Sequence, residues 1–268
     1  MSIFCRLFRF YINSSIHVAL AVCAFTAITI NQLHLHYADD LLFFIFFGTI
    51  TGYNFVKYAG IAQLHHRSLT SGLKMIQIFS LFCFVCSLYY AFQVSWDVLL
   101  ACIPLGLLTL FYAVPLFPSN DNLRTTPTLK VFVIAAVWAG TTVYLPKVAF
   151  ELQWETEIII LLIQRFLIVL ALIIPFEIRD LTFDDKKLAT LPQLLGIKST
   201  KMLGYLLLFF ALGINFMSNS GDNWLFSEIL ISLTALAIYF SGKKQNPYYA
   251  SFWVEGIPIC CWLGQLFI

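Results

Sequence analysis

The chain has 268 residues, of which 60% are hydrophobic and only 11% are charged, and its mean hydropathy is +0.84. An ordinary soluble domain carries about 25% charged residues, so this composition excludes a soluble globular domain and indicates a polytopic membrane protein. The balance of 16 basic against 14 acidic residues excludes a nucleic-acid binder, which needs a basic surface. Seven cysteines, an odd number and mostly within apolar runs, exclude a secreted disulfide scaffold.

Long apolar runs recur along the whole chain, and their length suits membrane-spanning helices. A helix needs about 20 apolar residues to cross the hydrocarbon core of a bilayer, and helices are the default because each satisfies its own backbone polar groups. We therefore predict an all-α fold, a bundle of nine transmembrane helices that forms one domain over residues 1–268. The nine runs are 12–33, 41–62, 73–93, 97–117, 130–150, 157–177, 201–217, 224–241 and 249–267.

The basic residues give an independent test of the number of spans, because Lys and Arg concentrate in cytoplasmic loops. With nine spans, fourteen of the sixteen basic residues fall on the side of the N-terminus; Lys147 lies opposite and Arg165 lies within a span. The opposite loops carry acidic residues instead, among them Asp39, Asp97 and Glu151. We predict a multi-pass protein of the cell (inner) membrane with a cytoplasmic N-terminus and an external C-terminus.

A carboxylate-rich segment leaves the sixth run on the predicted cytoplasmic side. Glu177, Asp180 and Asp184 are spaced i, i+3 and i+7, which places them on one face of a continuing helix. Such oxygen ligands suit Mg²⁺, which commonly bridges carboxylates to the phosphates of a substrate. The alternative interpretation is a solvated helix end whose acidic side chains are neutralised by Arg179 and the lysines that follow Asp184.

The residues around this segment resemble a known family. Asp180-Leu-Thr-Phe-Asp184, followed by Thr190-Leu-Pro-Gln-Leu-Leu-Gly196, resembles the second aspartate motif of the UbiA-type intramembrane prenyltransferases. Asn54 and the segment Arg67-Ser-Leu-Thr-Ser-Gly72 look like the region of the first motif. Phe111-Tyr-Ala-Val-Pro115, with Arg124 and Lys130, looks like the Tyr-Pro and basic segment after the fourth span. The nine-helix arrangement is also similar to that of the family.

The resemblance implies an activity, a cofactor and a set of site residues. Family members transfer an isoprenyl group from a prenyl diphosphate to an aromatic or other acceptor, and Mg²⁺ holds the diphosphate between the two aspartate motifs. The implied partners are the bilayer, a prenyl diphosphate and an acceptor that the sequence does not identify. The implied residues are Asp180 and Asp184 as metal ligands and catalytic groups, Lys57 and Tyr58 as further catalytic groups, and Asn54, Arg67, Tyr112, Arg124, Lys130, Glu177 and Lys187 as substrate-binding groups.

The first motif departs from the family pattern, because no aspartate follows Asn54 and Lys57 stands among the positions where aspartates are usual. In one interpretation the Lys57 ammonium replaces a metal ion on the diphosphate. In the other, Lys57 pairs with Asp180 or Asp184 and the protein is a catalytically degenerate homologue that binds an isoprenoid lipid or a membrane partner without turnover. Both predict that Lys57 lies close to these aspartates, since charges in a membrane need partners. We favour an enzyme.

One further charged residue lies inside a span. Arg165 must face the interior of the bundle and find an acceptor, and Glu255 in the ninth run is the partner that we predict. A transporter is disfavoured, because the polar residues gather at one face instead of following a path across the bilayer.

Overall fold

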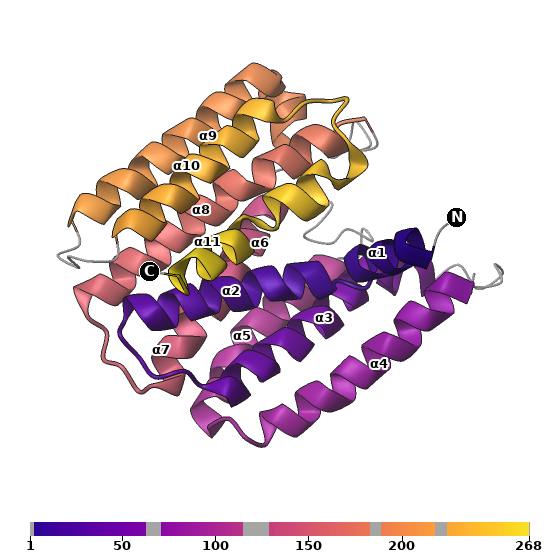
Figure 1. The fold of residues 1–268 in the computed structure, drawn as a ribbon, viewed down its shortest axis with the longest axis vertical. Helices are drawn as coiled ribbons and strands as arrows, with labels where there is room; N and C mark the ends of the chain where they lie inside the picture. Colours follow the sequence, from indigo (N-terminus) through magenta and orange to yellow (C-terminus); the bar gives the residue numbers. More distant parts are fainter. Residues whose placement is uncertain (1–2, 63–70, 115–128, 183–188, 218–223, 268) are drawn as a thin grey trace.

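A computed structural model of the chain describes residues 3–62, 71–114, 129–182, 189–217 and 224–267, and within these ranges it is helical and contains no strand. The predicted all-α class is therefore confirmed. Figure 1 shows the helices as a bundle, with α8, α9 and α10 packed together on one side and α2 to α5 on the other. The elements are α1 (Ile3–Asn13), α2 (Ile16–Gln32), α3 (Asp39–Ala62), α4 (Ser71–Ala91), α5 (Trp96–Ala113), α6 (Leu129–Ala139), η1 (Gly140–Tyr144), α7 (Leu145–Ala149), α8 (Thr156–Asp180), α9 (Leu191–Met217), α10 (Trp224–Phe240), η3 (Tyr249–Val254) and α11 (Ile257–Gln265), where η1 and η3 are π-helical.

Every predicted run falls on a helix or on a group of consecutive helices in the described chain. By length and apolarity, six of these segments can cross a membrane on their own, and the bent pair α1–α2 would be a seventh. The segment Phe226–Phe240 of α10 is apolar but shorter. The chain is thus a multi-pass membrane protein, and the prediction of nine helices matches its segments approximately.

The ends of the described chain lie at opposite ends of the bundle. Figure 1 places α1 near the end of α3, whereas α11 runs toward the other end. Which end faces the cytoplasm stays a prediction.

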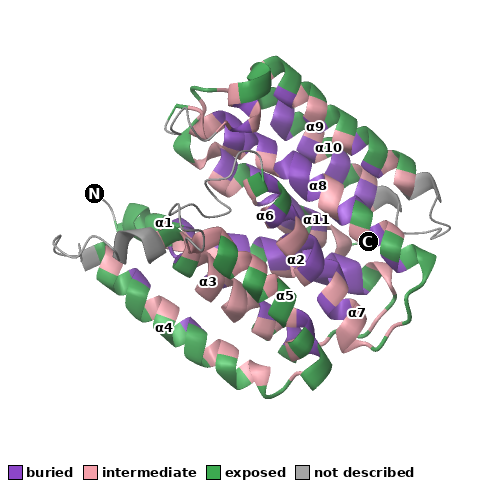
Figure 2. Ribbon diagram, turned by 180° about the vertical axis from the view of Figure 1, so that it is seen from behind, coloured by how far each residue is buried: buried purple, intermediate pink, exposed green. Residues whose placement is uncertain are grey.

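Helix α8 forms the centre of the core. Its buried residues Ile168, Leu172 and Ile178 belong to one hydrophobic cluster with Val22 and Phe25 of α2. Figure 2 shows the exposed residues on the outer faces of α4 and α9, and many of these are large and apolar, including Leu81, Phe82, Phe209 and Phe210. Side chains of this kind on the outside are stable in lipid, so the burial pattern suits a bilayer.

Several helices are interrupted by a bend, by a glycine with positive φ or by a π-helical turn. α1 and α2 meet at a bend of 55°, where Ser15 takes the left-handed conformation with φ 65°. Gly196 interrupts α9 with φ 77°, a conformation that glycine adopts without steric cost. The π-helical turns η1 and η3 each insert a residue into a helix, a feature that is frequent at functional sites.

Candidate functional site

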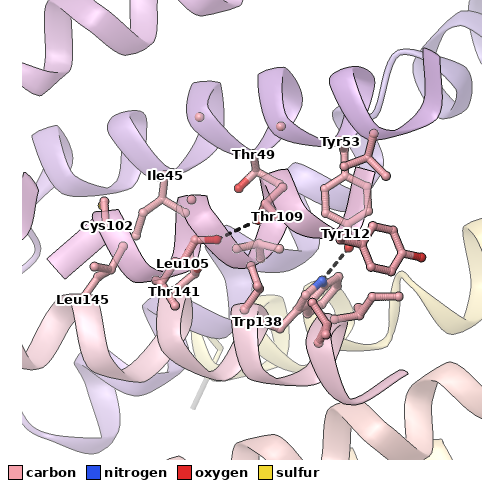
Figure 3. A pocket seen from close by; sticks show the side chains of 18 of the residues that line it. Ile45, Thr49, Tyr53, Cys102, Leu105, Thr109, Tyr112, Trp138, Thr141 and Leu145 are labelled. Atoms are coloured by element: carbon pink, nitrogen blue, oxygen red, sulfur yellow. Dashed lines mark hydrogen bonds between the residues drawn. The ribbon is translucent and has the colours of Figure 1, made fainter. Parts of the chain in front are cut away.

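Two adjoining cavities lie inside the bundle, and the larger one is apolar. It has a volume of about 440 Å³ and lies between α3, α5 and α6. Its walls include Ile45 of α3, Leu105 of α5 and Val133 of α6, and Figure 3 shows several of its side chains. Small-molecule sites commonly have volumes of about 300–1,000 Å³. The shape and lining therefore suit an apolar ligand or an apolar chain.

The smaller cavity is charged. It has a volume of about 360 Å³ and lies between α6, α8 and the segment around η3 and α11. Four Lys, Asp or Glu side chains line it: Lys130, Glu177, Asp180 and Glu255. Lys130 and Glu177 form an ion pair of 2.8 Å between Nζ and Oε1, and both side chains are largely buried.

Three aromatic residues join the two cavities. Tyr53, Tyr112 and Trp138, together with Ile134, line both of them. Trp138 Nε1 donates a hydrogen bond to the Tyr53 hydroxyl. Figure 3 shows the three rings gathered at one end of the apolar cavity. A ligand that occupies both cavities would pass these rings where its apolar part meets its polar part.

Asp180 is the last residue of α8, and its carboxylate forms an ion pair with the neighbouring Arg179. Arg179 Nε donates to Asp180 Oδ1 at 2.7 Å and Nη2 donates to Oδ2 at 3.1 Å. Such a two-point contact is the strong form of a charge-assisted hydrogen bond. Arg179 therefore lies beside the charged cavity, although the sequence interpretation used it only as a neutralising neighbour.

The residues of the first motif bind the bend between α1 and α2. Asn54 is buried, with 3% exposure; its Nδ2 donates to Ser14 O at 3.0 Å and to Ser80 Oγ at 2.7 Å, and its Oδ1 accepts from Ser15 Oγ at 2.8 Å. Lys57 Nζ donates to Ser15 Oγ at 3.0 Å. Tyr58 OH donates to Asn13 O at 3.0 Å. This end of α3 thus satisfies backbone and side-chain groups that the helix break leaves open.

The predicted pairing of Lys57 with Asp180 is wrong. Asp180 is held by Arg179, and Lys57 binds Ser15; the carboxylate that acts on Lys57 electrostatically is Glu255. The physical reason is that each charge finds a nearer partner on its own side of the cavity. Whether Lys57 approaches Asp184 lies outside the described residues.

The predicted partner of Arg165 is also wrong. Arg165 has 2% exposure and donates from Nη1 to Phe25 O at 2.9 Å and from Nη2 to Thr29 Oγ1 at 3.1 Å, with its guanidinium over the Phe25 ring. It ties α8 to α2 without a carboxylate. Glu255 is therefore left for another role.

The structure brings together part of the predicted site. Lys130, Glu177 and Asp180 line the charged cavity, Lys57 lines the apolar one and Tyr112 lines both. Asn54 and Tyr58 line neither of these cavities. Four further predicted residues lie outside the described part of the chain: Arg67, Arg124, Asp184 and Lys187.

Sequence reasoning missed three residues of the site. Tyr53 and Trp138 join the cavities, yet in the sequence they look like two more aromatic residues among many. Glu255 was noticed as an intramembrane acid but was assigned to the wrong partner. An intramembrane carboxylate is by default a functional candidate, and this signal could have identified Glu255.

The described residues do not assemble a metal site. They contain no group of three His, Cys, Asp or Glu side chains close enough to hold an ion. Both Asp180 oxygens already accept from Arg179, and the other predicted ligand, Asp184, is outside the described ranges.

Comparison with solved structures identifies the fold. A UbiA homologue from Archaeoglobus fulgidus bound to GPP and Mg²⁺ matches with a TM-score of 0.63 and 14% identity, over 97% of this chain and 100% of that chain. The same homologue bound to DMAPP and Mg²⁺ matches with a TM-score of 0.60 and 16% identity, over 100% of both chains. A structure of digeranylgeranylglyceryl phosphate synthase matches with a TM-score of 0.57 and 15% identity, over 98% of this chain and 99% of that chain.

No family model matches the sequence, and no curated protein is significantly similar to it. The class is nevertheless defined at the level of architecture: a multi-pass helical membrane protein with the UbiA-type fold. The fold predicted from the second aspartate motif is confirmed.

Proposed function

We propose that the protein binds a prenyl diphosphate and transfers its isoprenyl group to an aromatic or other acceptor of a lipid pathway. The observation that carries this proposal is the pair of adjoining cavities, one apolar and one charged, which suits a ligand with a hydrocarbon chain and a polar head. Two of the matched structures show a protein with this fold bound to GPP and to DMAPP. The isoprenyl chain would occupy the apolar cavity between α3, α5 and α6.

The diphosphate would lie at the charged cavity. Lys130 lines this cavity, Arg179 is bound to a carboxylate that lines it, and Lys57 lines the adjoining one. Cleavage of the allylic C–O bond develops negative charge on the leaving diphosphate. Fixed positive groups in a site that excludes water stabilise such charge effectively. Lys57, Lys130 and Arg179 would supply that stabilisation.

Magnesium remains part of the proposal. Mg²⁺ prefers oxygen ligands and commonly binds carboxylates together with substrate phosphates. Asp180 and Asp184 are the carboxylates that would hold it. Binding would require Asp180 to exchange its contact with Arg179 for the ion, which would release Arg179 toward the diphosphate.

A second function is favoured by one specific observation. The residues at the first-motif positions Asn54, Lys57 and Tyr58 all bind the bend between α1 and α2, so that region serves the fold. A protein with only one functional motif could bind an isoprenoid lipid or a membrane partner without turnover. This is the catalytically degenerate alternative.

One experiment separates the two functions. The purified protein is incubated with labelled dimethylallyl, geranyl and longer diphosphates, with Mg²⁺ or with EDTA, and both binding and release of diphosphate are measured. An enzyme binds the substrate and releases diphosphate. The degenerate alternative gives binding without release, and absence of binding at every chain length rejects both.

The proposed site faces the cytoplasm of the cell (inner) membrane. The support for this orientation is the distribution of basic residues in the loops. A reporter that is active only in the cytoplasm should give a signal when inserted between Lys243 and Lys244 and none when fused after Ile268. Activity of the C-terminal fusion would contradict the orientation.

A further inference from the structure

Glu255 presents a carboxylate to the charged cavity without a direct partner. It follows the π-helical turn η3 and lines the cavity with Glu177 and Asp180. These two carboxylates bind Lys130 and Arg179. Within the described ranges, the Glu255 carboxylate has no hydrogen bond or ion pair, although the backbone N–H of Glu255 donates to Ala250 O at 3.1 Å. A carboxylate enclosed in a protein is costly unless a positive or proton-donating group compensates it.

The cations around Glu255 act on it only at a distance. Lys57 and Arg179 interact with it electrostatically, but the Lys57 ammonium binds Ser15 and the Arg179 guanidinium binds Asp180. Glu255 is therefore available to a ligand.

Aromatic rings surround the same cavity. Tyr53, Tyr112 and Trp138 line it together with Glu255, and these rings also mark the junction with the apolar cavity. The faces of such rings attract positive charge. The part of the cavity beside the rings and Glu255 therefore favours a cation or a proton donor, whereas the diphosphate would lie beside Lys130 and Arg179.

The backbone that carries Glu255 is held firmly. His17 Nε2 hydrogen-bonds to Phe252 O at 2.9 Å, and the Tyr11 hydroxyl hydrogen-bonds to His17 Nδ1 at 2.7 Å. The His17 ring also stacks on Phe252. These contacts join the π-helical turn to α1 and α2 and fix the direction of the residues that follow it.

We propose that Glu255, with the rings of Tyr53, Tyr112 and Trp138, forms a subsite for a positively charged or proton-donating group next to the reacting end of the isoprenyl chain. The role of this subsite in the transfer reaction rests on the function proposed above. In that reaction, the bond between the allylic carbon and the diphosphate oxygen breaks, and its electron pair leaves with the diphosphate. The acceptor forms a new bond to that carbon and loses a proton, which passes to the Glu255 carboxylate. The acceptor group at this subsite is a hydroxyl, an amine or an aromatic C–H, and not a carboxylate.

The test compares two probes that differ only in the head group, geranylamine and geraniol, which share one isoprenoid chain. Their binding is measured by calorimetry on the full chain in lipid nanodiscs, for the wild type, Glu255→Gln and the control Glu157→Gln. Glu157 is exposed in the first turn of α8. Geranyl diphosphate is titrated in parallel, and melting temperatures report folding.

The wild type should bind geranylamine about tenfold more tightly than geraniol, which corresponds to about 1.4 kcal/mol. Lys57 and Lys130 repel an ammonium, so such a preference would report the rings and carboxylates of the cavity, and Glu255→Gln separates Glu255 from Glu177 and Asp180. Glu255→Gln should abolish the preference and bind geranyl diphosphate at least as well, while Glu157→Gln should behave as the wild type. No preference in the wild type, or a preference that survives in Glu255→Gln, would overturn the subsite.

If Glu255→Gln does not fold, absence of the amine preference in the wild type would still overturn the subsite. Failure of geranyl diphosphate to bind would reject the proposed function, whereas the amine preference would still report on the subsite.

Discussion

The ends of α3 and α8 carry the two segments that resemble aspartate motifs, and the structure uses them differently. At the end of α3, Asn54 and Lys57 bind the bend between α1 and α2. At the end of α8, Glu177 and Asp180 line a charged cavity with basic partners. The segment at the end of α3, which carries no acidic residue at these positions, thus has a structural role.

The comparison shows that polar residues inside a membrane protein need interaction partners, but that these interactions can serve either the fold or a ligand site. A buried amide with several hydrogen bonds stabilises a helix break. A charged pair beside an empty volume can exchange its partner for a ligand. Variants at the two ends should therefore separate stability from ligand binding.

The largest effect is expected at the α8 side, from Lys130→Met. Loss of this charge from an enclosed cavity should weaken geranyl diphosphate binding about a hundredfold, or about 2.7 kcal/mol. It should also lower the free energy of unfolding by about 3 kcal/mol, because Glu177 loses its ion pair. Calorimetric titration and thermal unfolding measure the two effects.

A double variant and a control make this test specific. Lys130→Met combined with Glu177→Gln should regain most of the stability but not the binding. Lys198 is exposed, and Lys198→Met should change neither quantity. Unchanged geranyl diphosphate affinity in Lys130→Met would show that the charged cavity is not the head-group site.

The next effect is expected at the α3 side, from Asn54→Ala. This variant loses three hydrogen bonds of a buried side chain, each contributing about 1 kcal/mol, so the free energy of unfolding should fall by about 2–3 kcal/mol. Geranyl diphosphate affinity of the folded protein should stay within about twofold, since Asn54 lines neither cavity. Asn31→Ala removes an exposed amide and serves as the control. Lost binding with unchanged stability would restore Asn54 to the ligand site.

Lys57 combines a structural contact with a position at a ligand cavity, because it binds Ser15 at the bend and also lines the apolar cavity. Lys57→Met should weaken geranyl diphosphate binding about tenfold, or about 1.4 kcal/mol. Its unfolding free energy should change by less than about 1 kcal/mol, since one hydrogen bond is lost. Lys74→Met, an exposed lysine on α4, is the matched control. A large loss of stability without loss of binding would make Lys57 purely structural.

The smallest effect is expected at Gly196, where the segment after the second motif breaks α9 with φ 77°. Gly196→Ala should destabilise the protein by about 1 kcal/mol, since φ 77° with ψ 161° is a conformation essentially restricted to glycine. Gly213 lies in the same helix without such a conformation, so Gly213→Ala should instead stabilise by about 0.5–1 kcal/mol. Equal effects in unfolding experiments would contradict a special role of Gly196.

The bundle was predictable because apolar length and loop charge are properties of the chain itself. Part of the charged cavity was also predictable from the sequence, because the spacing of Glu177 and Asp180 places them on the same face of a helix. Lys130 and Glu177 both appeared in the prediction, but their ion pair did not. Partners are decided by tertiary packing, which a single sequence does not encode in its spacing.

The errors have the same origin. Lys57 and Arg165 were assigned carboxylate partners by charge alone, whereas the structure gives them a hydroxyl, a carbonyl and an aromatic ring. Ser14 and Ser15 at the bend supply the oxygen atoms that Lys57 and Asn54 bind. The sequence around the bend contains no proline or glycine from which it could have been predicted. The π-helical turn before Glu255 changes the direction of that side chain by inserting one residue, which no helical periodicity predicts.

The central claim, that the isoprenyl chain occupies the apolar cavity, is tested most directly by filling that cavity. Gly106 lines it on α5, and a Cβ placed there would meet no atom within 4 Å, so Gly106→Leu should fold. The measurement is the affinity for dimethylallyl, geranyl and farnesyl diphosphates, with Gly213→Leu as a control outside the cavity. We expect Gly106→Leu to weaken farnesyl diphosphate binding by about tenfold or more, or about 1.4 kcal/mol, and to leave dimethylallyl diphosphate nearly unchanged. Equal affinities of Gly106→Leu and Gly213→Leu for all three chain lengths would contradict the claim.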